Sequence, residues 1–243
     1  MGVLYVVATP IGNMEDITLH ALRVLGEVAL VAAEDTRTTR GLLRRYDIKT
    51  PVTSFHDFTG EGKTQRLVDR IQQGDDVALV SDAGMPAIAD PGFPLIREAI
   101  RAGCEVTCIP GPSAVQTALV LSGLPLHAYH YIGFLPRKKG ERRRLLAARS
   151  TEPETLVCFE SPHRLVATLQ DAAEAMGGER PMAAARELTK KFEEVVRGSI
   201  AEVLEHFEKA GCRGEFTLVF GGLADVMKRD TRETLDICET LDI

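Results

Sequence analysis

Long hydrophobic runs are missing from this 243-residue sequence. No apolar stretch approaches the ~18 residues that a membrane-spanning helix needs. The first residues, MGVLYVVATPIG, lack a basic start and continue directly into an apolar segment typical of a strand. These features argue against a membrane span and against a secretory signal peptide. We therefore expect a cytoplasmic protein without a membrane partner.

Several motifs for common ligands are also missing. No GxGxxG motif follows the first strand-like segment, which argues against a dinucleotide site of the Rossmann type. The GEGKT segment at 60–64 lacks the GxxxxGK[ST] spacing, so ATP or GTP binding is not expected there. The five cysteines, at positions 104, 108, 158, 212 and 238, show no zinc-ligand spacing. We expect them to be small buried hydrophobic residues in a reducing compartment, and we expect no metal.

Charge is unevenly distributed along the chain. The net charge of −6 argues against a protein coated in nucleic acid. Residues 137–149, RKKGERRRLLAAR, are nevertheless strongly cationic with a single glutamate, whereas residues 223–243 carry six acids against three bases. The basic segment is either the solvated face of a helix or a surface that contacts phosphates.

The clearest structural pattern lies in residues 77–114. Two short apolar runs, Val77–Val80 and Val106–Ile109, each end in a turn rich in glycine or proline, and a segment with helical spacing lies between them. This order predicts parallel strands buried on both faces, with ligands at their carboxyl ends. The turns at 81–84 and 110–113 should therefore lie on the same rim of one sheet.

Other strand ends in the first half carry similar turns. The run Leu4–Ala8 is followed by the turn at 9–13, and the run Val28–Ala33 is followed by Glu34–Arg37. Charge at the end of a buried strand is costly unless it is paired or used. The charged cluster is therefore either functional or the N-cap of the next helix.

The second half has shorter and more evenly spaced strands, which indicates a mixed sheet. Gly123–Pro125 is the predicted hinge between the halves. We expect two α/β domains in series with a cofactor cleft between them. The predicted bounds are 1–122 for the N-terminal domain, 123–224 for the C-terminal domain and 225–243 for an acidic tail.

Seven motifs occur in a fixed order over almost the whole chain. They are ATPIGN at 8–13, EDTR at 34–37, SDAGMPAIADPG at 81–92, PGPSA at 110–114, GFLPRK at 133–138, FESPHR at 159–164 and RELTKKFEE at 186–194. Together they closely resemble the ribosomal RNA small subunit methyltransferase I branch of the tetrapyrrole (corrin/porphyrin) methylase superfamily. One departure from that pattern is the loop at 54–63, which reads SFHDFTGEGK.

The resemblance implies a function and a set of partners. It implies two α/β domains, S-adenosylmethionine bound in the cleft between them, and a homodimer. The implied reaction is methyl transfer to the ribose 2′-oxygen of a cytidine in the decoding centre of 16S rRNA, within the 30S subunit. Two alternatives stay open: a porphyrinoid methyltransferase of the same fold, which would not need the basic segment, and a ribosome-associated protein that binds the cofactor without catalysis.

The resemblance also implies site residues. The cofactor would be held by Pro10, Asp82, Ala83, Gly84, Ile88, Pro110, Gly111, Pro112, Ser113, Ala185, Glu215, Phe216 and Thr217. The RNA would be held by Arg37, Lys138, Arg142, Arg143, Arg144, Arg164, Arg186 and Lys190.

A ribose hydroxyl is a weak nucleophile, so a general base within hydrogen-bond reach would help methyl transfer. Glu160 and Glu187 are the candidates, because both lie at strand ends and both are followed or preceded by cationic residues. For each carboxylate, a structural salt bridge is the alternative interpretation.

Overall fold

The computed structural model describes residues 1–56 and 61–223. The predicted acidic tail at 225–243 and part of the loop at 54–63 lie outside the described residues. The chain divides into two compact units. Unit 1 comprises Met1–Ala114 with Leu188–Lys191, and unit 2 comprises Val115–Glu187 with the chain from Phe192 onward. The predicted domain boundary at 122/123 stays a prediction.

Unit 1 is built on a five-stranded parallel sheet. Its strands are β1 (Val3–Val7), β2 (Leu30–Ala33), β3 (Val52–Ser54), β4 (Val77–Val80) and β5 (Glu105–Ile109), in the spatial order β3-β2-β4-β1-β5. All neighbouring strands run parallel, as the buried apolar runs predicted. Their carboxyl ends therefore share one edge.

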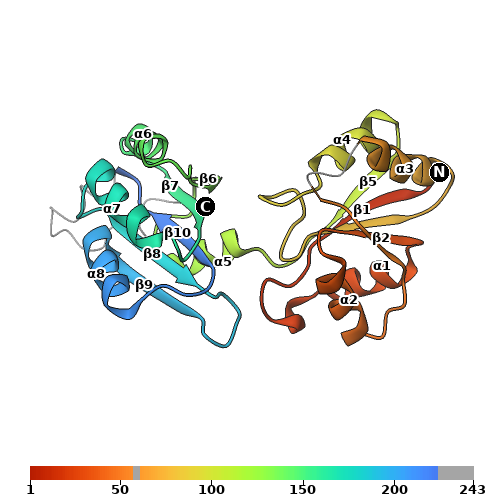
Figure 1. The fold of residues 1–243 in the computed structure, drawn as a ribbon, viewed down its shortest axis with the longest axis horizontal. Coiled ribbons are helices and arrows are strands. Elements are labelled where there is room, and N and C mark those ends of the chain that lie inside the picture. The colour runs from red at the N-terminus through yellow and green to blue at the C-terminus, as the bar shows by residue number, and fades with distance from the viewer. Residues whose placement is uncertain (57–60, 224–243) are drawn as a thin grey trace, which may run out of the picture. The chain divides into compact units, whose positions relative to one another are not determined.

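Helices cover both faces of this sheet (Figure 1). They are α1 (Leu19–Glu27), α2 (Thr36–Arg45), α3 (Glu61–Gln72) and α4 (Phe93–Arg101), and a short 3₁₀ turn, η1, covers Met14–Asp16. The strand β2 shows how the faces are divided: Val31 and Ala33 pack with side chains of α1 and α2, whereas Leu30 and Ala32 pack with those of α3 and α4. This alternation follows from the two-residue period of a strand.

Unit 2 is built on a mixed sheet, as predicted. Its strands are β6 (Tyr129–Phe134), β7 (Thr155–Glu160), β8 (Pro181–Arg186), β9 (Glu194–Ser199) and β10 (Phe216–Phe220), in the spatial order β6-β7-β10-β8-β9. Only β6 and β7 pair in parallel. The helices are α5 (Ala114–Ser122), α6 (Lys139–Arg149), α7 (Leu165–Met176) and α8 (Ile200–Ala210), and side chains of the last three join one hydrophobic core with the sheet.

The cysteines do not all behave as predicted. Cys104 and Cys158 are buried, Cys212 is partly buried, and Cys238 lies outside the described residues. Cys108 is exposed, contrary to the expectation. The reason is that β5 is an edge strand, so part of its side chains face solvent. Among the described residues, no helix combines the length and the apolar character that crossing a membrane requires.

Candidate functional site at the strand ends

Three turns of unit 1 meet at the carboxyl edge of its sheet, and the sequence predicted this for two of them, at 81–84 and 110–113. Thr9 after β1 and Gly84 after β4 exchange two backbone hydrogen bonds, of 2.9 and 3.0 Å, and the Thr9 hydroxyl donates to the Ser81 carbonyl at 3.1 Å. Gly111 after β5 lies so close to β1 that a Cβ at this position would come within 2.9 Å of the Ala8 Cβ. A glycine is needed here because the backbone itself is the packing surface.

The charged cluster after β2 caps a helix. Asp35 is the N-cap of α2, and its carboxylate accepts hydrogen bonds from the Arg37 backbone at 2.8 Å and the Arg37 guanidinium at 2.6 Å. These hydrogen bonds hold the pKa of the Asp35 carboxyl at about 2. The Asp35 amide in turn donates to the Asp82 carboxylate at 3.0 Å, which joins the ends of β2 and β4. Burial raises the pKa of Asp82. The N-cap interpretation is therefore confirmed.

The loops that follow β4 and β8 carry backbone strain. Five non-glycine residues among those described have a positive φ, and four of them lie in these two loops: Ala87 (67°), Ala89 (64°), Glu187 (50°) and Thr189 (64°). Each such residue costs on the order of 1–3 kcal/mol, and such strain gathers at ligand-binding and catalytic sites. The strain therefore falls on two of the segments that the sequence singled out.

Glu160, at the end of β7, lies in a buried network. It is 2% exposed, and its Oε1 accepts the Ser161 backbone N–H at 2.7 Å and pairs with Arg164 at 2.5 Å. Its Oε2 accepts the Thr168 hydroxyl at 2.6 Å. Arg164 also donates to the Leu135 carbonyl at 3.1 Å. Glu160 thus forms the structural salt bridge that the sequence left open as the alternative.

Glu187, at the end of β8, has different surroundings. It is only partly buried, and its Oε1 accepts the backbone N–H of Glu215 at 3.0 Å. Its own N–H donates to the Glu215 carbonyl at 3.0 Å. A Cβ on Gly214, which has a φ of 83°, would collide with the Glu187 side chain. The Glu215 backbone N–H, in the chain before β10, therefore helps to fix the orientation of this carboxylate.

The other predicted cofactor contacts of unit 2 lie in its sheet. Ala185 pairs with Thr217 across β8 and β10, and both are buried. The Phe216 ring packs edge-on against Phe207 with centroids 5.3 Å apart and belongs to the core. Strand alternation turns the Phe216 side chain inward, so a cofactor contact of Phe216 would involve its backbone, and that contact stays a prediction.

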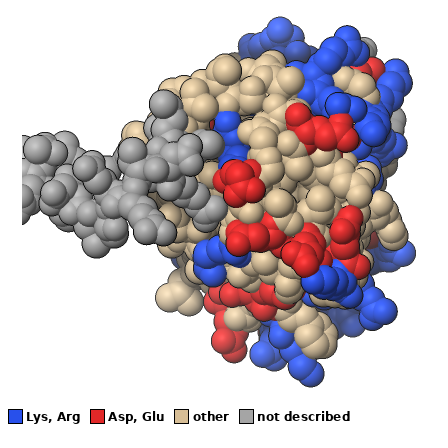
Figure 2. Space-filling view, turned by 90° about the vertical axis from the view of Figure 1, so that its left-hand side faces the viewer, with Lys and Arg blue, Asp and Glu red and all other residues tan. Residues whose placement is uncertain are grey.

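The basic helix α6 divides its cations between surface and interior. Lys138, Arg143 and Arg144 are exposed. Figure 2 views the molecule from the left-hand side of Figure 1 and shows Lys and Arg side chains gathered at the top, the level at which α6 lies in Figure 1. Arg142 is 4% exposed and pairs with the buried Asp171 of α7 at 2.5 Å. The prediction that Arg142 contacts RNA is therefore wrong, because a helix turns one residue of such a run inward.

The remaining predicted RNA contacts are found in three places. The Arg37 side chain is 87% exposed. Arg186 pairs with Glu194 at 3.1 Å and donates to the Arg213 carbonyl at 2.7 Å. Lys190 packs beside Gly12 within unit 1. Arg37 is thus the most accessible of the three.

Asp171 and Thr168 are partners in the buried networks that the sequence did not single out. Both lie among buried residues on α7, on the same face as Leu165, Leu169 and Ala172. Polar residues on the apolar face of a helix signal buried partners, because an unpaired polar group there is costly. That signal was present in the sequence, although it does not name the partner.

Comparisons with known proteins place the chain in a family. The family model of the tetrapyrrole (corrin/porphyrin) methylases matches residues 3–204 of this chain. The uroporphyrin-III C-methyltransferase of Thermus thermophilus, solved with S-adenosylhomocysteine, shares the fold with a TM-score of 0.62 and 21% identity, over 94% of this chain and all of that chain. The protein therefore belongs to the tetrapyrrole methylases.

Nearer relatives define the branch. The ribosomal RNA small subunit methyltransferase I of Halalkalibacterium halodurans is 48% identical over 91% of this chain and 76% of its own length. The protein of the same name from Thermotoga maritima is 47% identical over 91% of this chain and 99% of its own length. The chain thus belongs to the ribosomal RNA small subunit methyltransferase I family, which confirms the resemblance carried by the seven motifs.

Proposed function

We propose that this protein is an S-adenosylmethionine-dependent methyltransferase that modifies the ribose 2′-oxygen of a cytidine in 16S rRNA. The observation that carries the proposal is the 47–48% identity, over 91% of the chain, to relatives named for methylating small-subunit ribosomal RNA. The nucleotide, its 2′-oxygen and the decoding centre are the finer part of the proposal and come from the motif resemblance.

The rim of unit 1 fits the cofactor. Asp82, Ala83, Pro110 and Gly111 are exposed there, which leaves backbone atoms and small side chains accessible, and Ile88 is an apolar side chain with 48% exposure. An adenine, a ribose and an amino acid need backbone donors, backbone acceptors and an apolar contact. When bound, S-adenosylmethionine supplies an electrophilic methyl carbon. Glu215, Ala185 and Thr217 of unit 2 stay proposed contacts.

The two carboxylates have separate roles in this proposal. The partners of Glu160 among the described residues lie within its own unit, its side chain has no exposed surface, and both oxygens already accept hydrogen bonds. Glu160 is therefore a positioning residue that orients Arg164. Glu187 is the proton acceptor for the 2′-hydroxyl, because it is partly exposed and its orientation is set by the Glu215 backbone.

RNA binding is assigned to exposed cations. Arg143 and Arg144 lie on α6, Lys138 is the N-cap of this helix, and Arg37 lies on α2. Within the described part of the chain, Arg143 pairs only with Glu174, a half-exposed carboxylate, so a phosphate can replace that partner at small cost. Such contacts position the RNA rather than read its sequence.

The test is methyl transfer from labelled S-adenosylmethionine to 30S subunits from a strain that lacks this modification, with the labelled nucleotide mapped. Glu187→Gln should lower kcat by roughly 10²- to 10⁴-fold, the usual contribution of a general base, with KM nearly unchanged. Glu205→Gln on the exposed face of α8 is the matched control and should leave kcat as it is.

The RNA surface is tested in the same assay. The Arg143→Ala/Arg144→Ala double variant should raise KM for the 30S subunit. It should also make the slope of log binding constant against log salt concentration shallower by about one for each lost phosphate contact. Lys209→Ala serves as the control, because this exposed cation lies on α8 rather than α6. Absence of label on every ribosomal particle would refute the proposed substrate, and label on a porphyrinoid would support the alternative reaction.

We further propose a homodimer in the cytoplasm. The dimer comes from the motif resemblance, and a cytoplasmic location follows from a ribosomal substrate. Light scattering of the full chain tests the first point, because a mass near 26.5 kDa would identify a monomer instead.

A further inference from the structure

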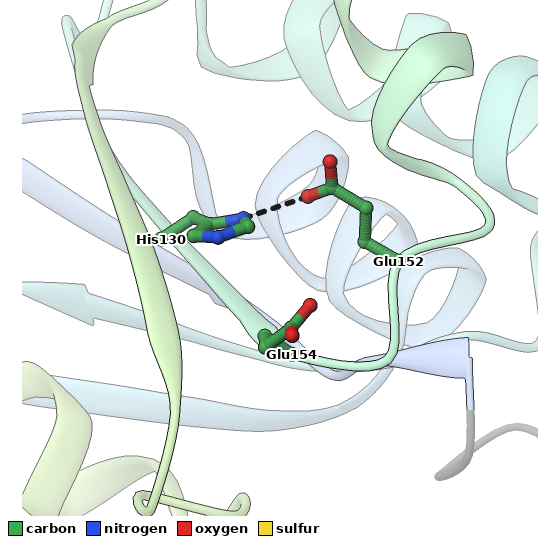
Figure 3. Close-up of side chains that lie close together, drawn as sticks. All are labelled: His130, Glu152 and Glu154. Carbon is green, nitrogen blue, oxygen red and sulfur yellow. Dashed lines mark hydrogen bonds and ion pairs between the residues drawn. The ribbon is translucent and has the colours of Figure 1, made fainter.

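Three residues that methyl transfer does not use come together at one end of unit 2. His130 lies on β6, and Glu152 and Glu154 lie in the segment between α6 and β7 (Figure 3). One ligand atom from each residue lies within 4.8 Å of those of the other two. In the part of the chain that the structure describes, this is the one group of histidine, cysteine, aspartate and glutamate side chains with such spacing.

The backbone around the three residues is held in place. The Thr155 hydroxyl donates to the Pro125 carbonyl at 2.8 Å, and the Leu223 amide donates to the Glu152 carbonyl at 2.9 Å. Tyr129 and Thr155 are register partners in the β6–β7 pair, which places His130 beside the segment that carries both glutamates. The ligand atoms therefore sit on a fixed frame rather than on a free loop.

The charges in the group are not balanced. The Nδ1 of His130 lies 2.7 Å from Oε2 of Glu152, and the Arg149 guanidinium binds Oε1 of Glu152 at 2.6 Å. Glu154 forms no hydrogen bond or ion pair with any described residue, although it is partly buried. Two carboxylates thus face one guanidinium, and the Glu154 oxygens remain available to a cation.

We propose that His130, Glu152 and Glu154 bind one Zn²⁺ ion, with water as the fourth ligand. One imidazole nitrogen and two carboxylate oxygens form a ligand set that zinc accepts. Ligands about 2.0–2.1 Å from tetrahedral zinc lie about 3.3 Å apart. The 2.7 Å separation of Nδ1 and Oε2 therefore has to open only slightly when a metal ion binds between them.

Arg149 is the group that opposes zinc. Its Nη1 donates to Oε1 of Glu152 and also lies 3.5 Å from Nδ1 of His130. The guanidinium therefore competes with a metal ion for the Glu152 carboxylate. Replacing Arg149 by glutamine should tighten zinc binding. The site joins the end of α6 to β6 and β7, so bound zinc would brace the helix that carries the exposed cations.

The experiment uses the untagged full chain, stripped with a chelator and titrated with Zn²⁺ by calorimetry. We expect one ion per chain and a higher thermal unfolding midpoint. His130→Ala and Glu154→Gln should each weaken binding by about tenfold or more, since even residues that only support metal ligands change affinity by 10- to 100-fold. Mg²⁺, which avoids imidazole nitrogen, should not bind at this site.

His206→Ala is the matched control. His206 also pairs with a glutamate, Glu194, at 3.2 Å, but no third ligand group joins this pair among the described residues. Its replacement should leave zinc affinity unchanged. Co²⁺ gives an independent measurement, because its visible spectrum should show tetrahedral coordination that disappears in His130→Ala. Zinc binding that is absent, or equal in wild type and His130→Ala, would overturn the proposal, as would unchanged affinity in Arg149→Gln.

Discussion

Replacing Arg142 by methionine should strongly destabilise unit 2. The change leaves the carboxylate of Asp171, whose side chain is 2% exposed, without its guanidinium partner. Lys139 lies 3.8 Å from Asp171, but its side chain is 65% exposed and compensates little. Breaking a buried pair by removing one partner costs about 3–5 kcal/mol. That is a large fraction of the 5–15 kcal/mol free energy of unfolding typical of a domain.

Two controls separate this effect from the loss of a surface charge. Arg143→Met removes a neighbouring cation whose pair with Glu174 has side chains 44% and 49% exposed, so it should cost no more than about 1 kcal/mol. The Arg142→Met/Asp171→Leu double variant removes both buried charges and should recover most of the lost stability.

Urea unfolding of the full chain measures these differences, and hydrogen exchange at α6 and α7 assigns them to unit 2. A loss of unfolding free energy in Arg142→Met no larger than that in Arg143→Met would contradict this prediction. So would a double variant as unstable as the single one.

Two further predictions concern the strand-end loops. Gly214→Ala should lower methyl transfer more than Gly211→Ala, because both glycines have a positive φ but only a Cβ at 214 would displace Glu187; equal losses of kcat would contradict this. Arg37→Ala should raise the pKa of Asp35 from about 2 toward its ordinary value of about 4, as measured by carboxyl NMR titration. Since the folded-state pKa is depressed, the stabilising contribution of the Asp35–Arg37 pair is present above the unfolded-state pKa and is lost as pH falls toward 2. An unchanged Asp35 pKa would exclude Arg37 as its cause.

Local patterns predicted much of the architecture. The apolar runs at Val77–Val80 and Val106–Ile109 indicated buried parallel strands, and the structure has β4 and β5 in these positions in a parallel sheet. The turns after them met at one rim because parallel strands end on the same edge. These predictions succeeded because they depend on short-range periodicity and on a general rule of sheet geometry.

The environment of individual side chains could not be predicted in the same way. Arg142, Arg143 and Arg144 are adjacent and chemically identical, yet only Arg142 is buried. The difference comes from Asp171, which is 29 residues away in the sequence and lies on another helix. Glu160 and Glu187 both lie at strand ends, but Glu160 is buried against Arg164 and two hydrogen-bond donors, whereas Glu187 is only partly buried.

The sequence by itself determined the class of the protein and the succession of its strands along the chain, and it singled out the loops of the candidate site. These features depend on patterns among residues close together in the sequence, such as the spacing of apolar residues, glycine-containing turns and the ordered motifs. Only the tertiary structure decided which carboxylate is enclosed, which arginine is buried and that His130 meets Glu152 and Glu154. These depend on pairs of side chains far apart in the chain, and a separation in sequence does not specify a distance in space until the strands and helices have packed.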